Sequence, residues 1–252
     1  MISDLVIGPT YLLRGSRLIM RSGLRRFLLA PLLINVSVFV VLIWFGASQF
    51  ESLMEWLLPS AQGWWAALAR GILWVVFAAA TGLLMFFAFT MVANLIAAPF
   101  NGLLAERVER VLGGRINDDG MGSQRNGLGA VVGAIVNELR KLRYFLIVVL
   151  FPLVLTLIPV INVVAPFVWL IITAWILALE YLAYPMENHG LHFSEVRRLA
   201  RANIFLTLGF GAAVMAIMVV PVINLTVIPA SVAGATAMWV DHLQHRRPRP
   251  DS

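Results

Sequence analysis

The sequence predicts an all-α integral membrane protein, with two long transmembrane helices, two partially penetrating helical hairpins and an N-terminal interfacial helix. Three observations support this class. Hydrophobic residues make up 60% of the 252 residues and charged residues only 13%, whereas a soluble domain carries roughly a quarter charged residues. Long apolar blocks follow one another along the chain. The basic residues gather between these blocks, a distribution typical of cytoplasmic loops.

The expected elements form a single membrane domain over residues 1–252. In chain order they are an interfacial helix at 1–22, transmembrane helices at 23–50 and 71–105, a cytoplasmic helix and loop at 106–142, a first hairpin at 143–185, a cytoplasmic segment at 186–203, a second hairpin at 204–241 and a tail at 242–252.

The N-terminal segment has the pattern of an interfacial amphipathic helix. Residues Ile2 to Met20 mix leucine and isoleucine with Arg14 and Arg17, as helices lying in a membrane interface do. The stretch from Met1 to Arg26 has no short apolar core followed by a small-residue cleavage site. We therefore expect this segment to be retained.

Two apolar blocks, Phe27–Phe50 and Ile72–Ala98, predict full transmembrane helices. Each is longer than the roughly 20 residues that cross a membrane. The linker between them carries Trp56, Trp64 and Trp65, which fit an interfacial aromatic belt.

Two later blocks, Tyr144–Tyr184 and Ile204–Val240, are too long for one span and predict helical hairpins. Each is interrupted by the sequence Pro-Val-Ile-Asn, at 159–162 and at 221–224, and proline disfavours a continuous helix. The arms would be about 15 residues or fewer, or roughly 23 Å, which is less than the hydrocarbon thickness of about 30 Å. We therefore expect the tips to lie inside the membrane, covered by protein or facing water.

The two interruptions also indicate an internal repeat, as in many transporters. A second proline follows each motif, Pro166 or Pro229, and a carboxylate follows at a similar distance, Glu180 or Asp241. Short hairpins need neighbours to cover their tips, so we expect a homo-oligomer.

The distribution of basic residues predicts that both termini are cytoplasmic. Only Arg70 falls in the expected outer linker. The others precede the first block (Arg14, Arg17, Arg21, Arg25, Arg26), separate the second from the third (Arg107, Arg110, Arg115, Arg125, Arg140, Lys141, Arg143), separate the third from the fourth (Arg197, Arg198, Arg201) or close the chain (Arg246, Arg247, Arg249). Without a zinc-finger or RNA-stacking motif, this charge does not indicate a nucleic-acid partner.

The residues Ser22 to Arg26 predict an oxyanion site at the start of the first long helix. Ser22 is a candidate N-cap, and Gly23 lets a ligand approach the backbone. The amide groups at a helix start bind oxyanions, and the guanidinium groups of Arg25 and Arg26 add charge-assisted hydrogen bonds. The alternative is that both arginines anchor to lipid headgroups.

Each apolar block has one asparagine close to a proline: Asn35, Asn94, Asn162 and Asn224. Amide side chains in lipid are costly unless paired. If the four converge, they line a neutral polar path for an oxyanion. The alternative is hydrogen bonding between helices, which also favours asparagine in membranes.

Four charged residues follow the second span on one helix: Glu106, Arg107, Glu109 and Arg110. They predict a charged vestibule at a pore mouth, where arginine attracts anions. Because Glu106 and Arg110 are four residues apart, the alternative is a solvated ion pair on the helix surface.

No sequence feature indicates a metal, a cofactor or catalysis. The chain has no cysteine, so disulfides and thiolate sites are excluded. The pairs His189/His192 and His242/His245 lack a third ligand nearby and are expected to be interfacial. No phosphate-binding loop and no nucleophile–base motif occur. A non-transporting scaffold and an interfacial lipid-modifying enzyme stay open as alternatives, with Glu180 and Asp241 more simply explained as anchors or partners for arginine.

The chain resembles the CysZ-type bacterial sulfate permease family in four strings. These are Gly23-Leu24-Arg25-Arg26-Phe27, the run from Ala97 to Glu106 (AAPFNGLLAE), the run from Tyr184 to His189 (YPMENH) and the run from Gly234 to Asp241 (GATAMWVD).

This resemblance implies a multi-pass protein of the bacterial inner membrane that takes up sulfate, or sulfite and related oxyanions, for cysteine biosynthesis. The family's oxyanion-binding Gly-Leu-Arg motif maps onto Gly23, Leu24 and Arg25, with Arg26 adjoining. Its charged helix maps onto Glu106 and Arg110. The resemblance also implies partial-depth hairpins and no enzymatic activity, and it leaves channel-like and ion-coupled movement open.

Overall fold

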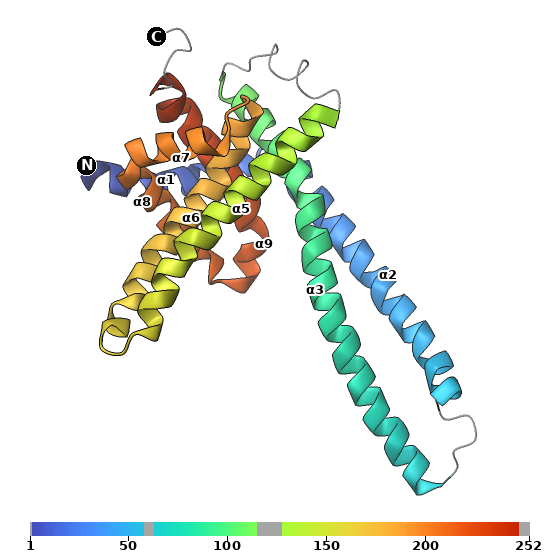
Figure 1. The fold of residues 1–252 in the computed structure, drawn as a ribbon. Helices are drawn as coiled ribbons and strands as arrows, with labels where there is room; N and C mark the ends of the chain where they lie inside the picture. Colours follow the sequence, from blue (N-terminus) through green and yellow to red (C-terminus); the bar gives the residue numbers. More distant parts are fainter. Residues whose placement is uncertain (1, 58–62, 115–127, 247–252) are drawn as a thin grey trace. The chain divides into compact units, whose positions relative to one another are not determined.

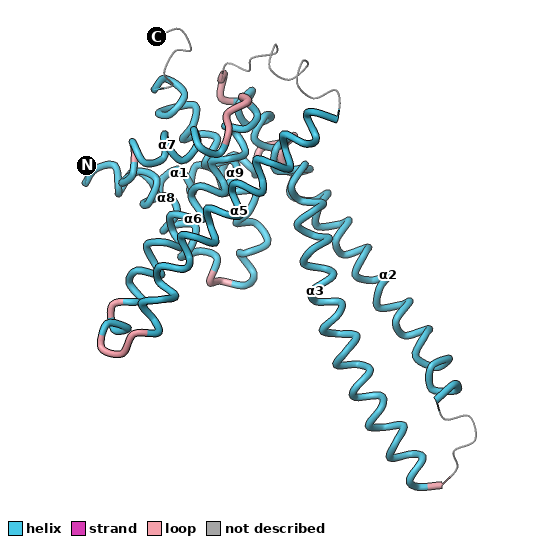
Figure 2. Tube along the Cα trace, viewed as in Figure 1, coloured by secondary structure: helices cyan, strands magenta, loops and turns pink. Residues whose placement is uncertain are grey.

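The computed structural model describes residues 2–57, 63–114 and 128–246, and every regular element within these ranges is helical (Figures 1 and 2). The predicted all-α class is therefore confirmed. The expected cytoplasmic loop within 106–142 and the tail at 242–252 fall partly outside the described residues, and so do the positions of Arg115, Arg125, Arg247 and Arg249.

The chain divides into two compact units where the sequence predicts one domain. One unit comprises Met1–Leu28 with Asn101–Ser252, and the other comprises Leu29–Phe100. The Leu29–Phe100 unit contains the greater part of two long helices.

The Leu29–Phe100 unit consists of most of α2 (Arg25–Leu57) and most of α3 (Trp64–Val111). The ring of Phe50 packs on the rings of Trp74 and Phe77, with centroids 6.0 and 4.8 Å away. Helix α2 begins two residues after the predicted start of the span 23–50 and continues beyond its end, and α3 extends beyond the predicted span 71–105 at both ends. The predicted ends lie where the apolar residues stop. The helices continue further because glutamate and arginine are good helix formers.

Among the described residues, α6 (Ala165–Asn188) is the one unbroken helix long and apolar enough to cross a membrane. A second candidate arises if α7 (Phe193–Ala202) and α8 (Ile204–Met218) count as one span despite the 104° bend between them. Val36–Phe50 and Ala67–Leu83, in α2 and α3, are shorter apolar segments. The number of spans and the depth of the hairpins therefore stay predictions.

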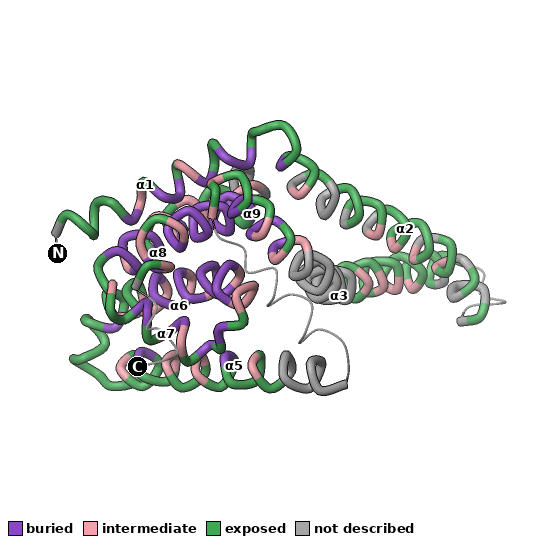
Figure 3. The backbone as a smooth tube through the Cα atoms, turned by 90° about the horizontal axis from the view of Figure 1, so that it is seen from above, coloured by how far each residue is buried: buried purple, intermediate pink, exposed green. Residues whose placement is uncertain are grey.

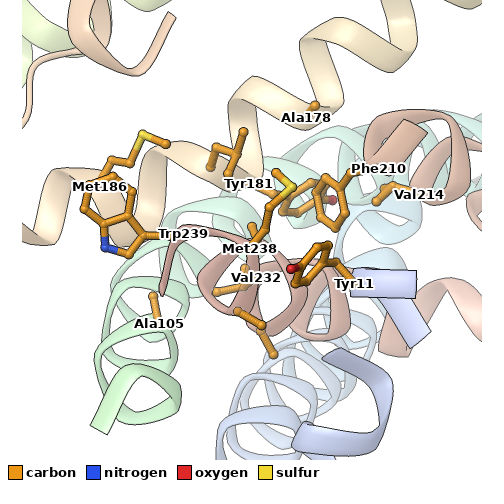
Figure 4. Close-up of a cluster of buried hydrophobic side chains, with 14 of the residues drawn as sticks. Tyr11, Ala105, Ala178, Tyr181, Met186, Phe210, Val214, Val232, Met238 and Trp239 are labelled. Carbon is orange, nitrogen blue, oxygen red and sulfur yellow. The ribbon is translucent and has the colours of Figure 1, made fainter. Parts of the chain in front are cut away.

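The larger unit is a helical assembly around one hydrophobic core (Figures 3 and 4). The core side chains come from several helices, including Tyr11 of α1, Tyr181 of α6, Phe210 of α8 and Met238 of α9. The elements are α1 (Ile2–Ile19), α5 (Leu128–Leu157), η1 (Ile161–Val163), α6, α7, α8, α9 (Pro221–Met238), the π-helical η2 (Trp239–Leu243) and η3 (Gln244–Arg246).

Helix α1 packs on α8 and α9 with direct backbone contact. A Cβ atom on Gly15 would lie 2.1 Å from the carbonyl oxygen of Ala230, and one on Gly209 would lie 2.3 Å from that of Leu5. Small residues permit such close approach between membrane helices. The helix expected at 1–22 is confirmed as a helix, but one of its faces belongs to the core while Val6 and Leu13 stay exposed.

The first hairpin turns at the predicted motif. Helix α5 ends at Leu157, Val160 has a φ of 74°, and α6 begins at Ala165. The predicted arm length is wrong, because α6 has 24 residues and is about 36 Å long. The helix continues through the polar residues that follow the apolar block and through Pro185 in its interior.

The second hairpin turns before its Pro-Val-Ile-Asn motif, so the predicted tip and the return arm starting at Ala230 are wrong. Pro221 is the first residue of α9, and Pro229 lies inside that helix. Proline is tolerated in the first turn of a helix because the amide hydrogen is not needed there. The two motifs thus occupy different structural positions, which contradicts the internal repeat at this point.

The close approach of α1 and α9 generates the first prediction. Gly15→Ala places a methyl group against the backbone of α9, so we expect a loss of about 1–3 kcal/mol in the free energy of unfolding. The measurement is thermal unfolding of the detergent-purified protein. Gly71→Ala in α3 is the matched control, because nothing lies within 4 Å of a Cβ atom there. Equal stability of the two variants would contradict the described packing.

Candidate functional site

The turn between α1 and α2 is built on Gly23, whose φ is 94°. This left-handed conformation favours glycine, and nothing lies within 4 Å of the position of a Cβ atom. The next residue, Leu24, is only 2% exposed and fixes the turn to the core. Gly23 is therefore required by the backbone conformation and faces open space.

Arg25 and Arg26 follow this turn with exposed side chains. The Nε atom of Arg25 donates a hydrogen bond of 2.7 Å to the carbonyl oxygen of Met20. The guanidinium carbon of Arg26 lies 5.1 Å from the centroid of the Phe27 ring. Both side chains are thus oriented by neighbours, and among the described residues the terminal nitrogens of Arg25 have no hydrogen-bond partner.

The structure differs in two respects from the oxyanion site predicted at residues 22–26. Helix α2 begins at Arg25, so Ser22 is too far upstream to be its N-cap. The amide of Leu24 donates to the carbonyl of Arg21 at 3.2 Å, because the chain closes a tight turn there, and is not free to bind an anion. The amide of Phe27 is also engaged, because it donates to the carbonyl of Leu24 at 3.0 Å. The candidate donors that remain are the two guanidinium groups and the amides of Gly23, Arg25 and Arg26, the last two lying at the helix start where amides lack an acceptor within the helix.

The charged end of α3 has two faces. Arg110 forms an ion pair with Glu106 one turn earlier, and Arg107 is exposed. Glu109 lies on the inner face with Ala105 and Val108 and is only 1% exposed. Glu106, Arg107 and Arg110 therefore remain candidates for the expected vestibule. Glu109 does not, because the helical repeat places its side chain on the inner face of α3.

Glu109 pairs with His189 at the end of α6. The Nε2 atom of His189 lies 2.8 Å from a Glu109 carboxylate oxygen, and both side chains are buried. The Trp239 ring covers the imidazole at a centroid distance of 5.4 Å. The expectation of an interfacial His189 is wrong, because this pair ties α3 to α6 and to the end of α9.

A second polar cluster joins α5 to α6 and α7. Lys141, the only lysine of the chain, places Nζ 2.9 Å from Glu180. Burial alone would lower the pKa of Lys141, but the attraction of Glu180 and the neighbouring carboxylates outweighs burial and raises it. Asn137 donates to Glu187 and accepts from the amide of Phe193, both at 3.0 Å. The sequence analysis singles out Glu180 as an anchor or a partner for arginine, and its partner in the structure is Lys141 instead. No local pattern marks Asn137 or Glu187 as members of this cluster.

Asp241 has the arginine partner that the sequence suggests. It forms an ion pair with Arg14 of α1 and accepts a hydrogen bond of 3.1 Å from the hydroxyl of Tyr11. The ring of His242 stands edge-on to the Tyr11 ring. These contacts fix η2, which directly follows α9, to α1, so Asp241 is a structural anchor.

Of the four asparagines expected to line a polar path, the structure describes the side chain of one. Asn162 lies in η1 at the tip of the first hairpin with an exposed side chain. The side chains of Asn35, Asn94 and Asn224 lie outside the described residues. Their convergence stays a prediction.

Comparison with known proteins identifies close similarity over most of the chain. Residues 11–229 match the family described as "Sulfate transporter CysZ/Etoposide-induced protein 2.4". Proteins named sulfate transporter CysZ are similar throughout. The one from Pseudomonas fluorescens (strain Pf0-1) is 42% identical over 234 residues, 92% of each chain. The one from Vibrio parahaemolyticus is 38% identical over 245 residues, 95% of this chain and 96% of its own.

The buried Glu109–His189 pair generates the second prediction. His189→Ala leaves a buried carboxylate without its partner, so we expect a loss of about 3–5 kcal/mol in the free energy of unfolding. The measurement is thermal or chemical unfolding of the detergent-purified protein. Arg110→Ala is the control: it breaks the more exposed pair with Glu106, which contributes no more than about 1 kcal/mol. A His189→Ala variant as stable as this control would rule out the buried pair.

Proposed function

The chain belongs to the sulfate transporter CysZ/etoposide-induced protein 2.4 family, and on this premise we propose that it takes up sulfate across a membrane. The shared name of relatives about 40% identical over most of the chain supports sulfate as the substrate. A transporter of this family is not an enzyme. We further propose the bacterial inner membrane as its location and cysteine biosynthesis as the use of the sulfate.

The observation that carries this proposal is the arginine pair at the Gly23 turn. Sulfate is a tetrahedral dianion, and guanidinium groups bind such oxyanions with two parallel hydrogen bonds. The start of α2 adds amide donors and the positive end of the helix dipole. In this arrangement Met20 orients Arg25 through its carbonyl, and Arg26 supplies the second positive charge.

The remaining residues suggest how sulfate reaches and leaves this site. Arg107 and Arg110 at the end of α3 attract the anion to a vestibule, and Glu106 orients Arg110. Asn35, Asn94, Asn162 and Asn224 provide amide donors along a polar path. Channel-like and ion-coupled movement both fit a chain without a phosphate-binding loop motif.

The proposed membrane arrangement follows from charge and apolar exposure. Helices α2 and α3 cross the membrane, the hairpins α5–α6 and α8–α9 enter it, and both termini are cytoplasmic. Apolar side chains such as Trp44, Val75 and Phe151 are more than half exposed in the chain alone, which supports coverage by lipid or by further copies of the protein. Sulfite and related oxyanions fit the same donors.

The arginine pair generates the third prediction. Arg25→Ala combined with Arg26→Ala removes two charged donors, each hydrogen bond contributing about 1.5–3 kcal/mol. We expect sulfate binding to weaken by at least a hundredfold and sulfate flux into vesicles to fall to background. Binding is measured by titration with radiolabelled sulfate, and flux is measured in vesicles that contain the purified protein.

The matched control is Arg17→Ala combined with Arg21→Ala, which removes the same charge from exposed positions before the turn. We expect it to keep most of the sulfate binding. Unchanged binding and unchanged flux in the Arg25/Arg26 variant would refute the site assignment. A loss in both double variants would indicate a general charge effect instead.

A further inference from the structure

Helix α7 has one apolar and one basic face. Phe193, Val196 and Leu199 point into the core and are at most 5% exposed, whereas Arg198 and Arg201 are exposed. Among the described residues, neither of these arginines forms an ion pair. The outer face of α7 therefore presents two positive charges to its surroundings.

This helix is held firmly against α5. The guanidinium carbon of Arg197 lies 4.8 Å from the centroid of the Tyr144 ring. The ring of Phe193 packs on the rings of Tyr144 and Phe145, with centroids 5.6 and 5.7 Å away. At the start of α7, the carboxylate of Glu195 accepts a 2.9 Å hydrogen bond from the backbone amide of His192. The positions of Arg198 and Arg201 are thus set by the fold.

Helix α7 also lies where exposed polar surface gives way to exposed apolar surface. It bends by 104° into α8, whose exposed residues, beginning with Ile204 and Phe205, are apolar. On α5, exposed Arg143 directly precedes Tyr144, and the exposed residues of the next two turns are apolar. These residues are Leu146, Ile147, Leu150 and Phe151.

We propose that the outer face of α7, with Arg198 and Arg201, binds the phosphate groups of anionic phospholipids at the membrane surface. Helices with a basic face beside apolar surface lie at the level of the headgroups. Guanidinium groups match phosphate geometry with paired hydrogen bonds. Each arginine near an anionic membrane surface strengthens binding about fivefold. This surface is separate from the arginine pair proposed to bind sulfate.

The test measures lipid binding by the full-length protein. The delipidated protein in detergent is titrated with phosphatidylglycerol or with phosphatidylcholine of the same acyl chains, and bound lipid is read by native mass spectrometry. We expect the wild-type protein to prefer phosphatidylglycerol. We expect Arg198→Gln combined with Arg201→Gln to reduce this preference roughly 25-fold, at about fivefold for each arginine.

Two controls keep the test specific. Arg198→Lys combined with Arg201→Lys keeps the charge and should keep most of the preference, and Arg70→Gln removes an exposed arginine of α3 and should keep all of it. Because Arg198 and Arg201 are exposed, the variants should unfold at the wild-type temperature. If the double variant is unstable, Arg198→Gln alone carries the test with a fivefold loss.

Three outcomes would overturn the proposal: equal binding of both lipids by the wild-type protein, an unchanged preference in the glutamine variant, or displacement of phosphatidylglycerol by millimolar inorganic phosphate, which would identify a site for a free anion. Sulfate binding at Arg25 and Arg26 should be unaffected in every variant. Failure of the lipid proposal would therefore leave the proposed sulfate uptake untouched.

Discussion

The close packing of α1 on α8 and α9 is the constraint on which the larger unit depends. Backbone meets backbone at Gly15 and Gly209, so α1 cannot slide or rotate without a clash. Asp241 also holds α1 in place, through its ion pair with Arg14 and the hydrogen bond that it accepts from Tyr11. Because α1 is fixed, the turn that follows it is fixed too, and the first residues of α2 begin at a defined point. The candidate sulfate site is thus a consequence of helix packing far along the chain.

The sequence predicted the helical class and most helices, because apolar blocks and prolines are local signals. It failed where one residue type has two structural roles. Proline ends a helix at Pro159 but begins one at Pro221, and only the surrounding packing decides between these roles. Helix ends were also misplaced, since hydropathy records where apolar residues stop and α6 continues beyond that point to Asn188.

Some features of the candidate site could likewise be predicted from residues adjacent in the sequence, and others could not. Gly23 and the arginines beside it are adjacent along the chain, so the sequence analysis singles them out, but it assigns Gly23 to the approach of a ligand and not to a positive φ. The hydrogen bond from the Leu24 amide to the Arg21 carbonyl is a local turn contact that the residue pattern does not reveal. The burial of Glu109 against His189 depends on a contact between helices. The sequence analysis places Glu109 among the four charges of the expected vestibule, because the residue pattern does not show which face of a charged helix end turns inward.

We propose that sulfate binds at the Gly23 turn through Arg25 and Arg26. The most direct measurement is an experimental structure of the protein with selenate, whose anomalous scattering locates the anion without reference to any variant. We expect a selenium peak within hydrogen-bonding reach of both guanidinium groups and the amides of Arg25 and Arg26. A peak elsewhere, with the arginines unoccupied at saturating selenate, would contradict this proposal.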